Sequence, residues 1–295
     1  MDLFSKCRLC PRQCGINRHF TVGACGVNSV LKAARAGLHL WEEPALSDGN
    51  GSGTVFFSGC TLKCCFCQNY QISHEGFGKE ITIERLGDIF LELQDQGANN
   101  INLVSPTHYV PHIISALDNI KHKLNIPVVY NSGGYDNIET LKLLKDYIDI
   151  YLPDLKYFSP ELSDKYSHAK NYFEYASQAI LEMHDQQPKL IWNGHLLKKG
   201  LIIRHLILPG CRHDSIKIIN WIAENLPVDS FMISLMSQYT PTYNSKNYPE
   251  INRKITTFEY NSVLNETIKL NLKGYTQNKA SASTEYTPDF NLEGL

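Results

Sequence analysis

Apolar and β-branched residues gather in short runs along this chain, and these runs predict strands. The runs cover 54–58, 101–104, 127–131, 148–152, 201–208 and 230–235. Between them, apolar residues recur every three to four positions, which predicts helices over 82–95, 111–122, 138–146, 172–184, 214–225 and 256–271. Strand and helix alternate six times, so we expect parallel strands with helices outside them.

Six such units favour an α/β fold of the partial (β/α)6 barrel type over a closed eight-stranded barrel. An open doubly wound sheet is the alternative that the pattern leaves open. The first 50 residues lack this alternation and are predicted to be irregular and rich in cysteine. The sequence therefore predicts a cysteine-rich N-terminal segment over 1–50, with room for a metal site, and a core domain over 51–295.

Composition narrows the class of protein. Of 295 residues, 43% are hydrophobic and 20% charged, which is typical of a globular chain. The formal net charge is −2, and this gives no support to general nucleic-acid binding, which needs a basic surface. We find no apolar run of about 18 residues and no secretory signal at the N-terminus. A cytoplasmic protein that does not bind membranes is expected.

The cysteines carry the strongest chemical signal. There are nine, and eight of them precede position 68. A secreted disulfide framework fits poorly with this length and the missing signal. Clustered cysteines in a cytosolic enzyme are more often metal ligands or catalytic thiols.

Three of these cysteines, Cys60, Cys64 and Cys67, have the spacing Cys-x3-Cys-x2-Cys directly after the first predicted strand. Three thiolates can hold three irons of a [4Fe–4S] cluster, which leaves the fourth iron open to the amino and carboxylate groups of S-adenosylmethionine (SAM). Phe66 precedes the last ligand and can shield the site from water. A zinc site or buried thiols are the alternatives, but zinc usually takes four ligands. Cys65 lies off the spacing and is predicted to be a packed thiol.

The stretch from Gly51 to Ser73 closely resembles the radical SAM proteins related to pyruvate formate-lyase activating enzyme, and the PflX-like branch in particular. Further stretches that resemble this branch are 7–15, 23–26, 42–44, 105–108, 131–135, 152–157, 204–210 and 236–239.

The resemblance implies an enzyme that reductively cleaves SAM to a 5′-deoxyadenosyl radical. The implied cofactors are a [4Fe–4S] cluster and SAM. The implied partners are a low-potential electron donor of the flavodoxin or ferredoxin type and a protein substrate, such as a glycyl radical enzyme that needs activation. Modification of another substrate stays open. The alternative from a different class is an iron–sulfur redox-sensing or scaffold protein without SAM turnover.

The resemblance also implies a set of SAM contacts at the ends of the strands. Arg204 resembles an arginine that binds the SAM carboxylate, and Asp154 and Lys156 resemble an Asp-x-Lys pair in which lysine helps to hold SAM. Asn131 follows the third strand, where a ribose can approach the glycines beside it. The family's Gly-Gly-Glu-Pro-like turn is missing here, so Thr107 or backbone carbonyls would bind the SAM amino group.

Ordinary turns and an Asp–Lys ion pair are the plainer interpretations of these residues. Two further departures from the activating enzymes are Tyr130, where they carry aspartate, and Gln238, near their histidine. Any monovalent-cation site carried over from them is therefore in doubt.

The N-terminal cysteines have the spacing Cys7-x2-Cys10-x3-Cys14-x10-Cys25. Four thiols within 19 residues can hold zinc or a second iron–sulfur cluster, and the neighbouring glycines allow tight turns around a metal. Reduced structural thiols are the alternative. Cys211 is a lone loop cysteine and receives no role.

Overall fold

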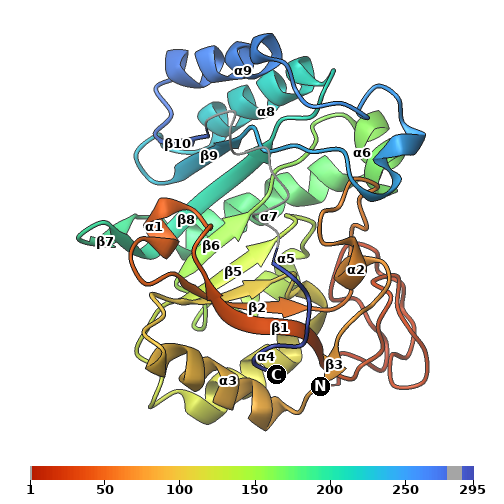
Figure 1. Ribbon diagram of the computed structural model, residues 1–295, viewed down its shortest axis with the longest axis vertical. Helices are drawn as coiled ribbons and strands as arrows, with labels where there is room; N and C mark the ends of the chain where they lie inside the picture. The colour runs from red at the N-terminus through yellow and green to blue at the C-terminus, as the bar shows by residue number, and fades with distance from the viewer. Residues whose placement is uncertain (1, 278–287) are drawn as a thin grey trace.

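The computed structural model describes residues 2–277 and 288–295, and a mostly parallel sheet runs through its centre (Figure 1). Within this part of the chain the strands are β1 (Lys32–His39), β2 (Ser52–Phe57), β3 (Lys79–Glu80), β4 (Ile101–Val104), β5 (Val128–Ser132), β6 (Ile150–Pro153), β7 (Ile191–Asn193), β8 (Leu196–Leu206), β9 (Met232–Met236) and β10 (Gly274–Thr276).

The strand order decides between the two predicted architectures. From one edge to the other it is β10-β9-β8-β6-β5-β4-β2-β1-β3, with parallel pairing from β2 through β10. Each parallel strand is added on the same side of the one before it, whereas a doubly wound sheet reverses its order at a switch point. Same-handed crossovers then place the helices that connect parallel strands on one face and curl the sheet into a barrel. The sheet is not closed, so the partial barrel is confirmed.

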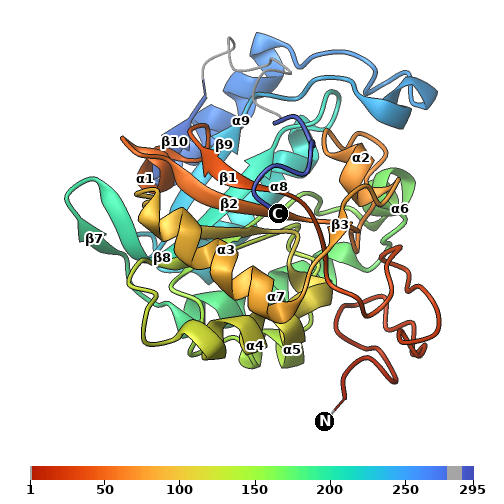
Figure 2. The same ribbon diagram turned by 60° about the horizontal axis from the view of Figure 1, so that its bottom comes forward.

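The long helices between the parallel strands cover the convex face of this sheet (Figures 1 and 2). The described helices are α1 (Pro44–Ser47), α2 (Tyr70–Ser73), α3 (Ile83–Asp95), α4 (Val110–Ile120), α5 (Ile138–Lys142), α6 (Pro160–Ser167), α7 (Tyr172–Gln186), α8 (Arg212–Asn225) and α9 (Thr257–Lys269), with 3-10 turns η1 (Thr107–Tyr109) and η2 (Tyr243–Asn247). Side-chain caps explain several starts. Thr82 accepts a hydrogen bond from Arg85 N–H at the start of α3, and Thr256 forms a capping box with Glu259 at α9.

All six predicted strands and all six predicted helices are present, but two sequence expectations were wrong. The first 50 residues are not wholly irregular, because β1 pairs antiparallel with β2 over most of its length. Its run Lys32-Ala33-Ala34-Arg35-Ala36-Gly37 is poor in β-branched residues, which hides it from propensity arguments. The strand predicted over 201–208 begins earlier than expected, since β8 starts at Leu196 after a hairpin with β7.

The inner face of the barrel is apolar at one end and polar at the other, because strand side chains alternate between faces. Ala45 and Leu46 of α1 pack on Val129, Leu152 and Ile202 and close the amino end of the barrel. Two residues later on the same three strands stand Asn131, Asp154 and Arg204. The alternation that buries the apolar trio thus places the polar trio inside the barrel, towards the carboxyl ends of the strands.

The segment before β1 lies against those carboxyl ends. In Figure 1 it forms the loops on the right, near α2. Arg12 fixes it there: its Nε donates to the carbonyl of Thr61 at 2.8 Å and its Nη2 to that of Ser167 at 2.9 Å. Thr140 donates to the Leu9 carbonyl at 2.8 Å. The domain boundary near residue 50 stays a prediction, and β1 joins the core sheet before it.

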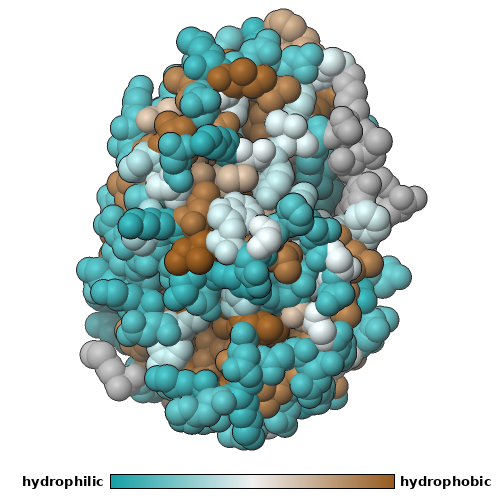
Figure 3. Space-filling view, turned by 90° about the vertical axis from the view of Figure 1, so that its left-hand side faces the viewer, coloured by the Kyte–Doolittle hydropathy of each residue, from teal (hydrophilic) through white to brown (hydrophobic). Residues whose placement is uncertain are grey.

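The face on the left of Figure 1 is mainly hydrophilic, with small separate hydrophobic areas (Figure 3). None of the helices in the described part of the chain is long and apolar enough to cross a membrane.

Candidate cysteine cluster site and SAM pocket

The loop that carries the cysteine triplet leaves β2 at Gly59 and ends at α2. Gly59 has φ +89°, and a Cβ there would lie 3.0 Å from the Cys25 carbonyl oxygen. Glycine is therefore needed to turn the chain beneath the N-terminal segment. Cys64 is buried and Cys60 and Cys67 are half-buried. This is the position that the sequence predicted for a cluster, after the first parallel strand and at the carboxyl end of the barrel.

Each sulfur of the triplet already accepts a hydrogen bond. The Leu62 N–H donates to Cys60 Sγ at 3.4 Å. The Ser167 hydroxyl, at the end of α6, donates to Cys64 Sγ at 3.0 Å, and the Ser73 hydroxyl donates to Cys67 Sγ at 3.3 Å. Such donors suit thiolates, because they stabilise negative charge on sulfur and tune the potential of an iron–sulfur cluster.

Burial favours the protonated form of two of these thiols, Cys67 and Cys64, because it raises their pKa values. It raises the pKa of Cys67 to about 12, with Cys60 and Cys64 acting in the same direction. Burial also raises the pKa of Cys64, against the opposing charge of Lys156. The mutual effects show that the three thiols lie within electrostatic reach of one another. Loading a metal centre here would release protons.

Cys65 is fixed by its backbone rather than placed as a ligand. Its N–H donates to the Tyr166 carbonyl at 2.8 Å, and its carbonyl accepts from the Asn244 N–H at 2.9 Å. The side chain belongs to the main hydrophobic core. This agrees with the prediction of a packed thiol.

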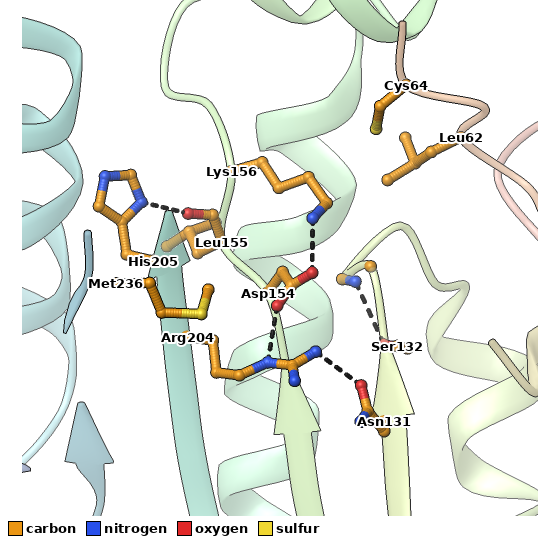
Figure 4. Close-up of polar contacts among 12 residues, drawn as sticks. Leu62, Cys64, Asn131, Ser132, Asp154, Leu155, Lys156, Arg204, His205 and Met236 are labelled. Carbon is orange, nitrogen blue, oxygen red and sulfur yellow. Dashed lines mark hydrogen bonds and ion pairs between the residues drawn. The ribbon is translucent and has the colours of Figure 1, made fainter. Parts of the chain in front are cut away.

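A charged network lies beside the triplet inside the barrel (Figure 4). Arg204 Nε donates to Asp154 Oδ1 at 2.8 Å, and Lys156 Nζ pairs with Asp154 Oδ2 at 2.5 Å. Arg204 Nη2 donates to Asn131 Oδ1 at 2.6 Å. Burial by itself raises the pKa of Asp154, but Arg204 and Lys156 outweigh burial and lower it. The charge of Lys156 also acts on the pKa of Cys64, so the network reaches the cysteine loop electrostatically.

Two glutamates before α1 complete this network, and the sequence arguments missed their role. Glu42 lies 3.7 Å from Arg204 Nη1. Burial raises the pKa of Glu43 to about 7, although Arg204 opposes the shift. In the sequence, these two residues were noted only as part of the stretch 42–44, which resembles the PflX-like branch. Arg204 therefore faces carboxylates from two distant parts of the chain.

Two adjoining cavities open onto this network. One, of about 210 Å³, is lined by Cys64, Cys67, Asp154, Lys156 and Arg204 among others. The other, of about 370 Å³, contains Arg204 together with Asn131, Glu42 and Glu43. The two cavities share five lining residues, which are Gln68, Asn69, Arg204, Met236 and Gln238. Together they form a polar space within the size range of small-molecule sites, with thiols at one end.

Thr107 is not brought into this space. Its hydroxyl donates to Asp136 Oδ1 at 2.7 Å and accepts from the Tyr130 hydroxyl at 3.1 Å. Ser132 also donates to Asp136, at 2.6 Å, and all four side chains are buried. Tyr130 therefore belongs to a structural network around Asp136, a residue that the sequence arguments did not single out.

His108 is likewise a packing residue. Its Nε2 lies 2.8 Å from the Ser58 carbonyl oxygen and must donate the hydrogen bond. Burial, reinforced by the charge of Arg18, lowers the pKa of His108 to about 3. A buried imidazole whose Nε2 is held by a carbonyl and whose pKa is this low is poorly suited to act as a base.

The two glycines after β5 have a packing reason. A Cβ on Gly133 would lie 2.8 Å from Leu62 of the cysteine loop, and one on Gly134 would lie 2.1 Å from the Asp154 carbonyl oxygen. Both contacts bring the chain after β5 close to parts of the site.

We expect Gly134→Ala to destabilise the protein by at least about 2 kcal/mol, because overpacking adds to backbone strain at φ +76°. Urea unfolding would measure this. Gly49→Ala is the matched control, since Gly49 has φ +77° with nothing within 4 Å, and strain alone costs about 1 kcal/mol. Equal losses in the two variants would contradict the packing argument.

The N-terminal cysteine set (Cys7, Cys10, Cys14 and Cys25) lies beside the cysteine loop. The Cys60 N–H donates to the Cys25 carbonyl at 3.1 Å. Burial raises the pKa of Cys10 to about 12, and the other three thiols of the set add to the shift, so all four lie within electrostatic reach. In the described part of the chain, no three His, Cys, Asp or Glu side chains are already gathered at the spacing of ligands to one ion.

Comparison with known families matches residues 54–207 to the family model described as the Radical SAM superfamily. This range holds the triplet, Asp154, Lys156 and Arg204. A curated relative, the uncharacterized protein MJ0674 of Methanocaldococcus jannaschii, is 35% identical over 286 residues, covering 92% of this chain and 77% of the relative.

Solved structures share the fold. A radical SAM methyltransferase from Sphaerobacter thermophilus matches 77% of this chain and 66% of its own, with a TM-score of 0.52 and 11% identity. Streptococcus suis SuiB bound to the precursor peptide SuiA matches 74% of this chain with a TM-score of 0.50 and 14% identity. This chain spans 46% of that SuiB chain. Identities this low carry the fold and no more.

Proposed function

This chain belongs to the radical SAM superfamily, and from that premise we propose that Cys60, Cys64 and Cys67 hold its [4Fe–4S] cluster. The observation that carries this proposal is the shared cavity, in which Cys64 and Cys67 face Asp154, Lys156 and Arg204. Three thiolates would leave one iron of such a cluster without a protein ligand and open to SAM, and the polar residues that line the cavity would hold SAM. When bound, the cluster supplies the electron that cleaves SAM to methionine and a 5′-deoxyadenosyl radical.

The chain's own residues orient and shield SAM in this proposal. Arg204 and Lys156 are cations suited to the SAM carboxylate, and Asp154 fixes both in place. Asn131 adds an amide beside Arg204. The SAM amino group is left to backbone carbonyls of the turn that contains Thr107, because the Thr107 hydroxyl is committed to Asp136. Phe66 and Tyr239 pack edge to face and both line the smaller cavity.

The finer assignment rests on sequence resemblance. We propose that this chain is a PflX-like relative of pyruvate formate-lyase activating enzyme and that it acts in the cytoplasm. Residues 51–295 form its catalytic core, and residues 1–50 form a cysteine-rich segment in which the N-terminal cysteine set binds zinc or a second cluster. Its electron donor is of the flavodoxin or ferredoxin type. Its substrate is a protein, such as a glycyl radical enzyme, or another molecule that reaches the cavity.

Anaerobic reconstitution with iron and sulfide, followed by reduction in the presence of SAM, tests the proposal. We expect 5′-deoxyadenosine and methionine in equal amounts. A fully loaded cluster that yields no 5′-deoxyadenosine would favour the redox-sensing or scaffold alternative, for which the missing glutamate turn is the specific argument.

Arg204→Ala is expected to leave the cluster in place and to weaken SAM binding by roughly 10- to 100-fold, because a charge-assisted hydrogen bond is lost. Equilibrium dialysis with labelled SAM would measure the affinity. Arg85→Ala is the control, since Arg85 pairs with Glu92 on the outer surface of α3. Unchanged SAM affinity in the Arg204 variant would remove the carboxylate contact and leave the cluster assignment intact.

A further inference from the structure

Arg18 is a fully buried cation in the N-terminal segment, with an exposed fraction of 0%. Its Nη1 donates to the His108 carbonyl at 2.7 Å, and its Nη2 donates to the Asn28 carbonyl at 2.6 Å. The rings of Phe4 and Tyr109 lie 4.9 and 5.8 Å from the guanidinium carbon. Among the residues that the structure describes, no carboxylate forms an ion pair with it.

This environment solvates the charge of Arg18 without neutralising it. Carbonyl oxygens and ring faces are neutral, and the buried Nε has no partner. A buried charge that lacks a counter-charge is costly, and such groups are normally paired or placed beside a metal centre. A negative charge is therefore expected close to the guanidinium.

The groups at the right place are thiols. Arg18 Nη1 lies 3.8 Å from Cys7 Sγ. A Cβ on Gly23 would lie 3.3 Å from Cys25 Sγ and 3.7 Å from both Cys14 Sγ and the Arg18 Cδ. Cys7 Sγ thus lies beside the guanidinium, and the sulfurs of Cys14 and Cys25 lie near Gly23, which the Arg18 Cδ also approaches.

This inference rests on the metal site proposed above for the N-terminal segment: we infer that the N-terminal cysteine set binds its metal centre as four thiolates and that Arg18 is the buried counter-ion of this centre. Four thiolates around Zn²⁺, or around an iron–sulfur cluster, keep a net negative charge. This negative charge would neutralise the guanidinium of Arg18, which has no carboxylate partner among the described residues. Zinc and iron–sulfur are two sources of the same anionic tetrathiolate, and metal analysis distinguishes them.

The centre would also support the loop of the cysteine triplet. The Cys25 carbonyl accepts from the Cys60 N–H, and Arg18 holds the carbonyl of His108, whose ring donates to the Ser58 carbonyl. Metal binding by the N-terminal cysteine set would therefore also hold Ser58 and Cys60, the residues on either side of the turn at Gly59.

The first experiment uses the full chain with Cys60, Cys64 and Cys67 replaced by alanine and purified without oxygen. Elemental analysis should find about one zinc, or iron with sulfide, per chain. Adding Cys14→Ser should remove this metal, and folding should survive because Cys14 is exposed. Cys211→Ser is the matched control and should keep it. Absence of both metals, or equal metal after Cys14→Ser, would overturn the site.

The second experiment tests the counter-ion. In competition with a chromophoric chelator, Arg18→Met should retain metal at least tenfold more weakly than the parent chain, and Arg18→Lys should lie closer to the parent. Equal metal retention in Arg18→Met and the parent chain would overturn the role of Arg18.

Discussion

Replacement of Cys64 by alanine is expected to abolish cluster retention and SAM cleavage together. Cys64 is the most buried member of the triplet, it accepts a hydrogen bond from Ser167, and it lies next to Lys156. Even a hydrogen-bond partner of a metal ligand is worth about 10- to 100-fold in metal affinity, so loss of a ligand should lower the yield of 5′-deoxyadenosine by more than about 100-fold. Iron content, cluster absorbance and 5′-deoxyadenosine would all be measured after anaerobic reconstitution.

Cys65→Ala is the matched control, because it removes the adjacent thiol and leaves the backbone hydrogen bonds of that residue in place. Cluster content and SAM cleavage should stay near those of the unmodified chain. Equal loss in the Cys64 and Cys65 variants would show that the ligands are wrongly assigned.

The second large effect is expected at Asp154. Asp154→Asn should lower the free energy of unfolding by about 3–5 kcal/mol, because it leaves Arg204 and Lys156 without their shared counter-charge in a site where all three side chains are 13–17% exposed. SAM binding should weaken as well, since neither cation would be held in position. Urea unfolding and equilibrium dialysis would measure the two effects.

Asp229→Asn makes the same chemical change in an exposed pair with Lys273 and should alter stability by less than about 0.5 kcal/mol.

The stability effect of Asp154→Asn should also depend on pH. The pKa of Asp154 is lowered in the folded protein, so its stabilising effect is present above the ordinary aspartate pKa of about 3.9 and is lost as the pH falls through the lowered value. The gap between the parent chain and Asp154→Asn should therefore narrow in acid. A gap that does not change with pH would contradict the ionic role.

The sequence by itself determined the elements of the core and the position of the cysteine loop. Periodicity marked six strands and six helices, because burial of one face leaves a local pattern that can be read along the chain. The same alternation put Asp154 and Arg204 two residues after Leu152 and Ile202, on the inner face. The triplet was readable because cluster ligands close together in the sequence have a fixed spacing.

Only the tertiary structure decided which charged groups meet. It paired Arg204 with Asp154 and with Glu42, residues that come from three separate parts of the chain. It also engaged the hydroxyl of Thr107 with Asp136, and it buried Arg18 among the thiols of the N-terminal cysteine set. Alternation along a strand fixes the face on which a side chain stands. Which side chain it pairs with depends on which distant segment packs against that face, and a local sequence pattern does not contain this information.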